Sequence, residues 1–293
     1  MSDADLPGDD PLVDLVDTAR YPGDPYGWHE LVAATQRELA VVGCCVLPDF
    51  VRPALHETLR REGDELAPQA YYRTETVNTY NIAVDTPLPA DHPGRITMRR
   101  GNAFVARDRI PPGAIIQRLY TSPVFVRFVA ACFGLPELHP LADPLSGLTL
   151  NVITPGKQHP WHFDVNDFTV SMLTQLPDGG GEFQYCPNIR SAESENFGDV
   201  RAVVHGRGDH LVRTLRLRPG DLQLFHGRYA LHRVSEVRGS RARHTAIFAY
   251  SRQPGVVGSV ARTRQLFGRV LPEHLSGRGA AGVGSVRVDQ LLD

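Results

Sequence analysis

One short segment, HPWHFDVNDF at residues 159–168, carries imidazole and carboxylate groups at a spacing that suits metal binding. Residues two apart in an extended strand point to the same side, so His162 and Asp164 are expected to face one direction. A second imidazole, His232, follows later in the strand-like run LHRV. Two histidines and one carboxylate on one face of a metal ion leave open coordination positions, which suit non-haem Fe(II) and its chemistry with O₂. We therefore predict that His162, Asp164 and His232 bind a metal ion.

The second histidine has a rival in His226, which ends the run DLQLF and lies beside Gly227. His232 is preferred because it lies closer to Arg241 and Arg243, which begin the last long strand-like run. These two arginines share parity, so both could point into the interior of a barrel. A guanidinium is a rigid, two-pronged donor for a carboxylate. We expect one arginine, with Arg243 preferred, to bind a dicarboxylate, and the other to be a structural ion-pair partner.

Other polar residues lie near these positions, in the predicted strands or in the loop before them. The candidates for contacts with a cofactor are Thr245, which shares the parity of the two arginines, and Thr149 and Asn151, which share one face of the strand before the metal motif. Candidates for substrate contacts flank the metal motif or precede the strands; they are His159, Trp161, Asn166, Arg99 and Arg100. Each has an ordinary alternative, because threonine is frequent in strands, aromatic side chains pack in cores and most arginines lie in solvent.

The elements that must position these residues divide into a helical first part and a strand-rich second part. Apolar residues at helical spacing predict helices over 28–41, 51–66 and 114–134. The last of these is expected to break near Pro123. Residues 71–84 have the pattern of strands, and 85–113 are rich in Pro and Gly, so we expect an ordered loop there that could act as a lid.

From residue 148 onward, short strand-like runs alternate with turn signals such as PDGGGE and VRGSR. The runs are LTLNVIT, HFDVNDFTVSMLTQL, GEFQYC, HLVRTLRL, DLQLF, LHRVSEV and RHTAIFAY. A helical start followed by such runs predicts an α+β fold, in which a jelly-roll-type barrel carries N-terminal and flanking helices outside. We expect a flexible N-terminal arm over residues 1–27 and a single domain over 28–293, with the barrel core at about 148–252.

Composition excludes several functional classes. The 31 Lys+Arg against 33 Asp+Glu give a net charge of -2, so there is no basic field for nucleic acid or anionic lipid. No apolar run is long enough for a transmembrane helix, and the acidic N-terminus MSDADLPGDDPLVD does not resemble a secretory signal. The 4 cysteines form no CxxC pair, so we expect no disulfide framework and no cysteine zinc site. A cytoplasmic protein with a small-molecule partner fits; the oligomeric state is not predicted.

The ordered set HxD, His and Arg resembles the Fe(II)/2-oxoglutarate-dependent oxygenases over roughly residues 40–270. GCCVLPDF followed by a helix is similar to the entry of the phytanoyl- and prolyl-hydroxylase-like branches, and RPGDLQLFHGRYALHRVSEVRGSRAR to their second metal-ligand hairpin. HPWHFDVNDFTV, GGGEFQYCPNIR and YSRQPGVVGSVARTRQLFGR resemble the group of free-amino-acid radical halogenases and their hydroxylase relatives. The resemblance implies a double-stranded β-helix (jelly-roll or cupin-like) core, with Fe(II) as cofactor and 2-oxoglutarate and O₂ as cosubstrates.

Halogenases of this group replace the carboxylate ligand with a small residue, which opens a site for chloride on iron. Because Asp164 is present, the resemblance implies a hydroxylase. The expected enzyme is a dioxygenase that hydroxylates an unactivated C–H of a free amino acid or similar small polar metabolite in biosynthesis, with succinate and CO₂ as coproducts. One alternative keeps this cofactor chemistry but acts on a larger natural-product, nucleotide or carrier-bound substrate. Another is a metal-binding jelly-roll protein without catalysis.

Overall fold

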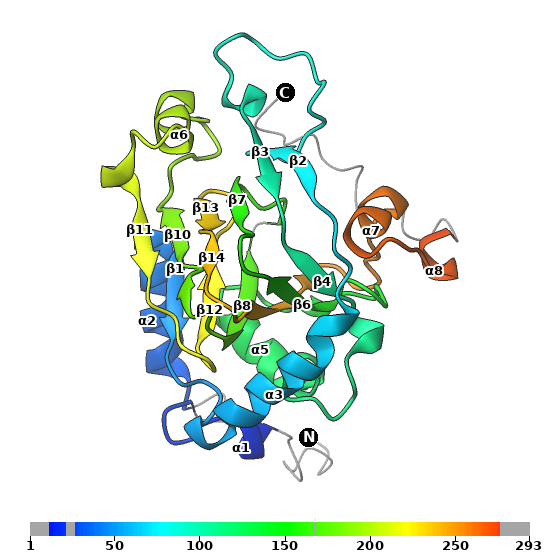
Figure 1. Ribbon diagram of the computed structural model, residues 1–293. Coiled ribbons are helices and arrows are strands. Elements are labelled where there is room, and N and C mark those ends of the chain that lie inside the picture. The colour runs from blue at the N-terminus through cyan, green and yellow to red at the C-terminus, as the bar shows by residue number, and fades with distance from the viewer. Residues whose placement is uncertain (1–11, 22–26, 167, 276–293) are drawn as a thin grey trace.

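Two antiparallel sheets lie face to face (Figure 1). The computed structural model describes residues 12–21, 27–166 and 168–275. The larger sheet has the order β1 (Cys44–Leu47), β12 (Leu222–Phe225), β8 (Thr169–Gln175), β15 (Arg243–Phe248), β6 (Leu148–Ile153) and β4 (Ala103–Val105). The smaller has the order β11 (Arg213–Leu215), β10 (Phe183–Cys186), β13 (Leu231–Val234) and β7 (His159–His162). Ile153 of the larger sheet packs on Val234 of the smaller, so the expected double-stranded β-helix is confirmed.

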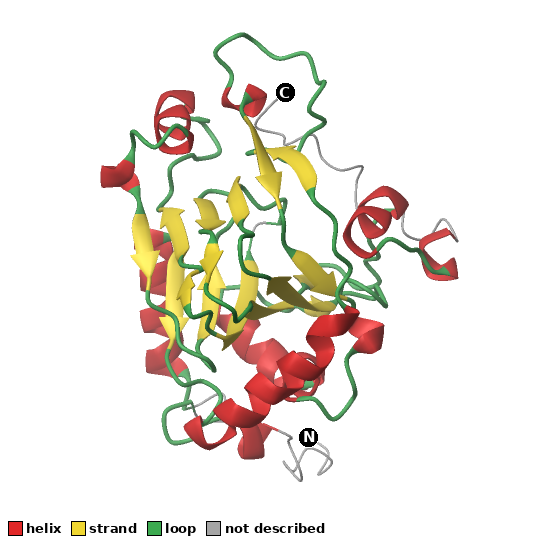
Figure 2. Cartoon of the chain, viewed as in Figure 1, coloured by secondary structure: helices red, strands yellow, loops and turns green. Residues whose placement is uncertain are grey.

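Helices pack against the larger sheet on the face that points away from the barrel interior (Figure 2). They are α2 (His29–Val42), α3 (His56–Leu66), α4 (Ile115–Thr121) and α5 (Pro123–Cys132). In β6, Leu148, Leu150 and Val152 join the core shared with these helices. Thr149 and Asn151 alternate with them and therefore point into the barrel, where both are buried. The alternation thus separates an apolar supporting face from a polar interior face.

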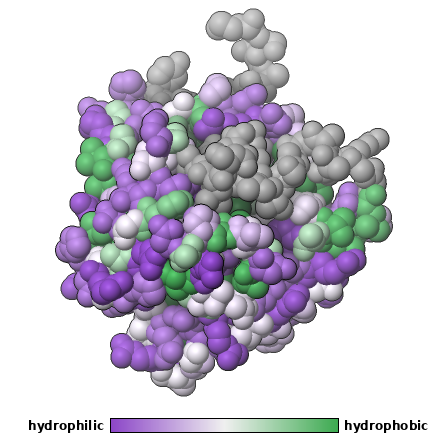
Figure 3. Space-filling view, turned by 90° about the horizontal axis from the view of Figure 1, so that it is seen from above, coloured by the Kyte–Doolittle hydropathy of each residue, from purple (hydrophilic) through white to green (hydrophobic). Residues whose placement is uncertain are grey.

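Further elements lie beside and above the two sheets. β2 (Glu75–Asn78) pairs with β3 (Thr97–Arg100), and the short pairs are β5 (His139–Pro140) with β16 (Tyr250–Ser251) and β9 (Gly179–Gly180) with β14 (Val237–Arg238). The remaining α-helices are α1 (Leu12–Leu15), α6 (Phe197–Val204), α7 (Val260–Phe267) and α8 (Pro272–Leu275). Single 3₁₀ turns cover Pro53–Leu55, Ala67–Gln69, Pro93–Arg95, Arg107–Arg109 and Asp209–Leu211. Seen from above, the described part of the surface is mostly polar, with apolar residues interspersed (Figure 3).

The helices predicted over 28–41, 51–66 and 114–134 are present, and the last is divided as expected. Ser122 ends α4 and caps α5, because its side chain accepts the N–H of Phe125 at 3.2 Å, while Pro123 occupies the first turn of α5. None of the described helices is both long and apolar enough to cross a membrane.

Three segments differ from the sequence prediction. Residues 12–21 do not behave as a loose arm, because Leu12 and Leu15 are buried in the main core; the rest of 1–26 lies outside the described residues. The expected loop at 85–113 contains β3 and β4, which pair with β2 and β6 through runs too short for a clear alternation. The run 162–176 is not one strand, since β7 ends at His162 and β8 begins at Thr169. The domain boundaries stay a prediction.

Candidate metal centre

Two strands of the smaller sheet and the segment after one of them bring three candidate ligands together. His162 ends β7 and lies opposite His232 of β13 in the strand register. Asp164 follows β7, and its N–H donates to the carbonyl of Gly227 at 3.1 Å. The Nε2 atoms of His162 and His232 lie 3.6 and 3.5 Å from Oδ1 of Asp164. One ligand atom from each residue lies within 4.8 Å of the others, a spacing that can hold a metal ion.

Backbone carbonyls fix the orientation of both imidazoles. Nδ1 of His162 lies 2.8 Å from the carbonyl of Pro160, and Nδ1 of His232 lies 2.9 Å from that of Ala230. A carbonyl oxygen can only accept, so Nδ1 carries the proton in both rings. Nε2 is then left with a lone pair directed at the position a metal would occupy, as in most histidine metal sites.

The protonation states also suit metal binding. Burial opposes the charged form of Asp164, but His232 and His162 outweigh that effect and hold the pKa of this carboxyl well below its usual range. Burial, with a further contribution from His232, lowers the pKa of His162, which therefore stays neutral. Thr169 donates to Oδ2 of Asp164 at 2.6 Å and leaves Oδ1 toward the histidines. An ionised carboxylate beside a neutral imidazole is the ligand form that a divalent cation needs.

Gly227 makes room for the carboxylate. A Cβ at this position would lie 2.0 Å from Oδ2 of Asp164 and 2.7 Å from its Cγ. No side chain can be accommodated there unless Asp164 moves. Gly227, which follows the rival histidine His226 in the sequence, is therefore itself part of the metal site.

A β-bulge places a third imidazole beside the ligands. His162 pairs with His232 but His159 pairs with Val234, so β7 spans the same length with one extra residue. The bulge turns His159 to the same face as His162, and their rings stack with centroids 3.8 Å apart. Burial, together with His162, lowers the pKa of His159 well below its usual range, so it is a neutral donor or acceptor beside the metal position.

The larger sheet supplies a buried polar wall that includes Arg243. In the register of β15 and β6, Arg243 lies opposite Ile153 and Thr245 opposite Asn151, so these side chains point into the barrel together. Arg243 is 3 % exposed, and Nη1 donates to Oγ1 of Thr245. None of the ion pairs found in the described residues includes Arg243, and burial lowers the pKa of its guanidinium to about 10.

The two alternatives weighed against these residues lie elsewhere. Arg241 is half-exposed on the turn before β15 and pairs with Asp178 at 3.0 Å, which is the structural role expected for the second arginine. His226 packs edge-on against Phe133, with ring centroids 5.5 Å apart, and is not among the three clustered ligands. Of each pair of alternatives, the structure places one residue, Arg243 or His232, in the barrel interior and the other, Arg241 or His226, outside the cluster of ligands.

The candidate substrate residues divide in the same way. Arg100 is buried at the end of β3 and pairs with Glu75, whereas its neighbour Arg99 is exposed. Trp161 points away from the ligands into an apolar cluster, and the guanidinium of Arg233 lies 4.6 Å from its ring centroid. Asn166 is exposed in a bend, because β7 ends at His162 and the strand parity does not extend to it.

Some residues near the site carry no signal in the sequence. Arg190 is almost fully buried, and its guanidinium lies 3.8 Å from the ring centroid of Phe163. Phe163 is the residue between the two ligands His162 and Asp164 in the sequence. Arg262 on α7 donates to Gln265 at 2.7 Å, and Gln265 donates to Glu75 at 3.0 Å. Nothing but the fold distinguishes these two arginines from the many that lie in solvent.

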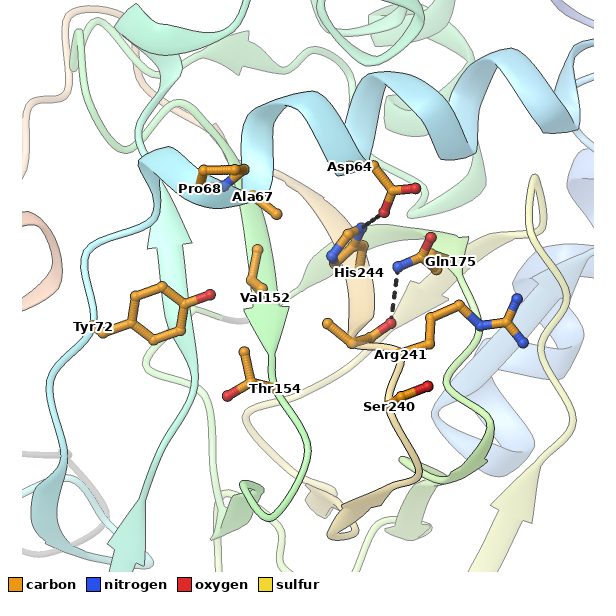
Figure 4. A pocket seen from close by; sticks show the side chains of 11 residues that line it. Asp64, Ala67, Pro68, Tyr72, Val152, Thr154, Gln175, Ser240, Arg241 and His244 are labelled. Carbon is orange, nitrogen blue, oxygen red and sulfur yellow. Dashed lines mark hydrogen bonds and ion pairs between the residues drawn. The ribbon is translucent and has the colours of Figure 1, made fainter.

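A separate pocket of about 380 Å³ lies on the other face of β15 (Figure 4). Its lining includes His244, which neighbours Arg243 in sequence but points outward, toward Asp64 of α3 at 4.0 Å. Gln175 donates to the carbonyl of Ala242 at 3.0 Å on the same wall. This pocket is therefore back to back with the barrel interior and does not contain the metal ligands.

The residues present fit iron and 2-oxoglutarate. Two imidazole nitrogens and one carboxylate oxygen converge from one side, which leaves the other side for further ligands. Asp164 keeps 23 % of its side-chain surface accessible, so that side can be reached. The buried cation of Arg243 lacks a carboxylate partner among the described residues, and a dicarboxylate would supply one.

Comparison with known proteins agrees with this geometry. Residues 26–263 match the Halogenase D (HalD) family. Similar solved structures include AviO1 from Streptomyces viridochromogenes, with 15% identity, a TM-score of 0.50 and coverage of 76% of this chain and 95% of that one. The carbocyclase SnoK of nogalamycin biosynthesis has 14% identity, a TM-score of 0.50 and coverage of 76% and 87%. A 2OG-Fe(II) oxygenase family protein from Burkholderia pseudomallei has 19% identity, a TM-score of 0.47 and coverage of 76% of this chain and 92% of that one. No curated protein shows significant similarity.

Proposed function

The chain belongs to the Halogenase D family of Fe(II)/2-oxoglutarate-dependent oxygenases, and from its site we propose that it hydroxylates a free amino acid or a similar small polar metabolite. The observation that carries the proposal is the complete ligand set of His162, Asp164 and His232. When bound, iron and 2-oxoglutarate would supply, together with O₂, an oxidant that removes hydrogen from an unactivated carbon; one oxygen atom of O₂ goes to succinate, which is released with CO₂, and the other to the product. The protein must hold both groups, place the substrate carbon beside them and exclude water.

We assign the cosubstrate to the polar wall of the larger sheet. Arg243 would bind its distal carboxylate, because it is a buried guanidinium without an acid partner among the described residues. Thr245, Asn151 and Thr149 line the same face and would complete the contacts by hydrogen bonding. Arg241 is exposed and engaged by Asp178, and so it is assigned a structural role.

Asp164 distinguishes hydroxylation from halogenation. The family name favours a halogenase, and this is the second candidate function. A halide on the metal would need the position that Oδ1 of Asp164 takes beside both histidines. The hydroxyl of Thr169 donates to the carboxylate, and the absence of a side chain at Gly227 leaves the space that the carboxylate occupies. Two neighbouring residues therefore fix its position.

The substrate side supports a small polar molecule. His159 stacks on His162 and offers a neutral imidazole next to the metal position. Arg100 is buried at the end of β3, close enough to His159 to affect its charge, and can bind a carboxylate. These two residues replace Trp161, Asn166 and Arg99 as the proposed substrate contacts.

The test begins with an anaerobic titration of the purified protein with Fe(II) and 2-oxoglutarate. The expected result is the weak visible charge-transfer band of a chelated cosubstrate. Succinate release is then measured across free amino acids in air, with and without chloride, and products are weighed by mass spectrometry. A product that gains one oxygen atom supports hydroxylation; a product that gains chlorine refutes it, and absence of the band in folded protein refutes the assignment of the site.

A further inference from the structure

A chain of polar contacts links α7 to the strands beside the metal site. Arg262 donates to Oε1 of Gln265 at 2.7 Å, and Nε2 of Gln265 donates to Oε2 of Glu75 at 3.0 Å. The same Oε2 accepts from Nη2 of Arg100. Glu75 and Arg100 are directly opposite each other in β2 and β3. The helix therefore carries Arg262 to the neighbourhood of a buried arginine on the substrate side.

Both arginines lie near the metal ligands. The charge of Arg262 interacts with those of Arg100 and Asp164, and the charge of Arg100 interacts with His159. Arg262 is exposed to solvent on α7, yet partial desolvation of its guanidinium by the surrounding protein lowers its pKa to about 10. A cation in such a position can be reached by a small molecule but is only partly hydrated.

Positive charge exceeds negative charge at this point. Arg73 and Arg100 pair with one carboxylate, Glu75, which lies 3.3 Å from Nε of Arg73, and Arg262 is linked to the same carboxylate through Gln265. In the described part of the chain, the other carboxylate that acts on Arg262 is Asp164, which is committed to the metal. Nε of Arg100 is buried and has no hydrogen-bond partner there. Two guanidinium groups are thus available to an incoming anion.

An amino acid with a neutral side chain would leave this arrangement unbalanced. It has no net charge and a single carboxylate, so one of the two arginines would keep an unmatched positive charge. A molecule with two carboxylates satisfies both arginines, and charge-assisted bonds to guanidinium groups are the strong ones.

We propose that the substrate is a dicarboxylic acid of the acidic amino acid class, with one carboxylate on Arg100 and the other on Arg262. The inference rests on the proposed function and names the substrate class of the same site. Arg262 is then a specificity-determining residue contributed by α7, outside the barrel.

The experiment compares acidic compounds with their neutral amides of equal size. Succinate release is measured with aspartate and asparagine, with glutamate and glutamine, and with lysine as a cationic contrast. We expect kcat/KM for the acid of a pair to exceed that for the amide by at least about 10-fold, and added salt to reduce the difference. Arg262→Gln should lower kcat/KM for the acid by about 10- to 100-fold and leave the amide little changed.

Two variants control for structural effects. Arg262→Lys keeps the charge and should keep the preference for the acid, and Arg264→Gln, on an exposed position of the same helix, should behave as the unaltered protein. Preference for amides or lysine, no stimulation by any acidic compound, or an equal loss for acid and amide in Arg262→Gln would overturn the inference. Each of these results leaves the charge-transfer band intact, whereas failure of the proposed function removes the band itself.

Discussion

Replacing Arg243 with methionine should make the protein more stable in the absence of cosubstrate and much less responsive to its presence. Arg243 is 3 % exposed and has no ion-pair partner in the described residues; its Nη1 is bonded to the neutral hydroxyl of Thr245. Such a charge is a cost to folding that a bound carboxylate offsets. Methionine has a similar length and no charge, so Arg243→Met removes the cost and the binding group together.

The magnitude follows from the pKa. Burial lowers the pKa of Arg243 to about 10, and the difference from the ordinary arginine value corresponds to roughly 3 kcal/mol. Near neutral pH the group is protonated in both folded and unfolded states, so the full cost is present there and falls only as pH rises through about 10. Loss of the bond to Thr245 costs about 1 kcal/mol. The net gain of about 2 kcal/mol should raise Tm by about 4 °C.

The assay is thermal unfolding with Mn(II) in place of Fe(II), with and without 2-oxoglutarate. At a concentration 100-fold above its Kd, the cosubstrate should stabilise the unaltered protein by about 2.7 kcal/mol. The same addition should stabilise Arg243→Met by less than about 1 kcal/mol, because the affinity of this variant falls by at least about 30-fold. Arg241→Met, at the exposed position, is the matched control and should respond normally. A variant that is less stable without cosubstrate, or that is stabilised by it as much as the unaltered protein, would refute the reasoning.

Three further predictions concern the metal site and the face behind it. Gly227→Ala should lower metal affinity by at least about 10-fold in calorimetry, because its Cβ would meet Asp164, while Gly113→Ala, in open space, should not. Asp164→Gly should abolish hydroxylation in the succinate and product assays; normal turnover would show that Asp164 is not a ligand. Burial lowers the pKa of His244 to about 4, so stability is fully present above the ordinary histidine pKa and declines as pH falls toward 4. His244→Gln should remove roughly 3 kcal/mol of that acid sensitivity in denaturant titrations, and the exposed His210→Gln none.

The residues of the metal site could be predicted from the sequence, but the way the backbone brings them together could not. His162, Asp164 and His232 were chosen from spacing, and the fold brings them together. Strand alternation accounts for only part of this site, because β7 ends at His162 and Asp164 lies after it. Asp164 is held at the site by the hydrogen bond from its N–H to the carbonyl of Gly227. This contact joins residues far apart in the sequence, so the local alternation of side chains cannot predict it.

Residues outside the motif were harder to predict for a physical reason. His159 lies on the face of His162 only because β7 has a bulge, and a bulge is set by the pairing of two distant strands. Arg262 and Arg190 depend on where α7 and the segment after β10 pack. Similarly, β3 and β4 are strands because partners are available, not because their few residues favour extension.

The bulge in β7 gives position 159 a strand partner of its own. His159 pairs with Val234, whereas His162 pairs with His232, so position 159 takes no part in the backbone pairing that holds the ligand. A substitution at 159 can therefore change which molecule is accepted beside the iron while the coordination geometry is preserved. In a lineage that acquires new substrates, or in a library built to obtain them, position 159 is one where selectivity can diverge without loss of the oxidising centre.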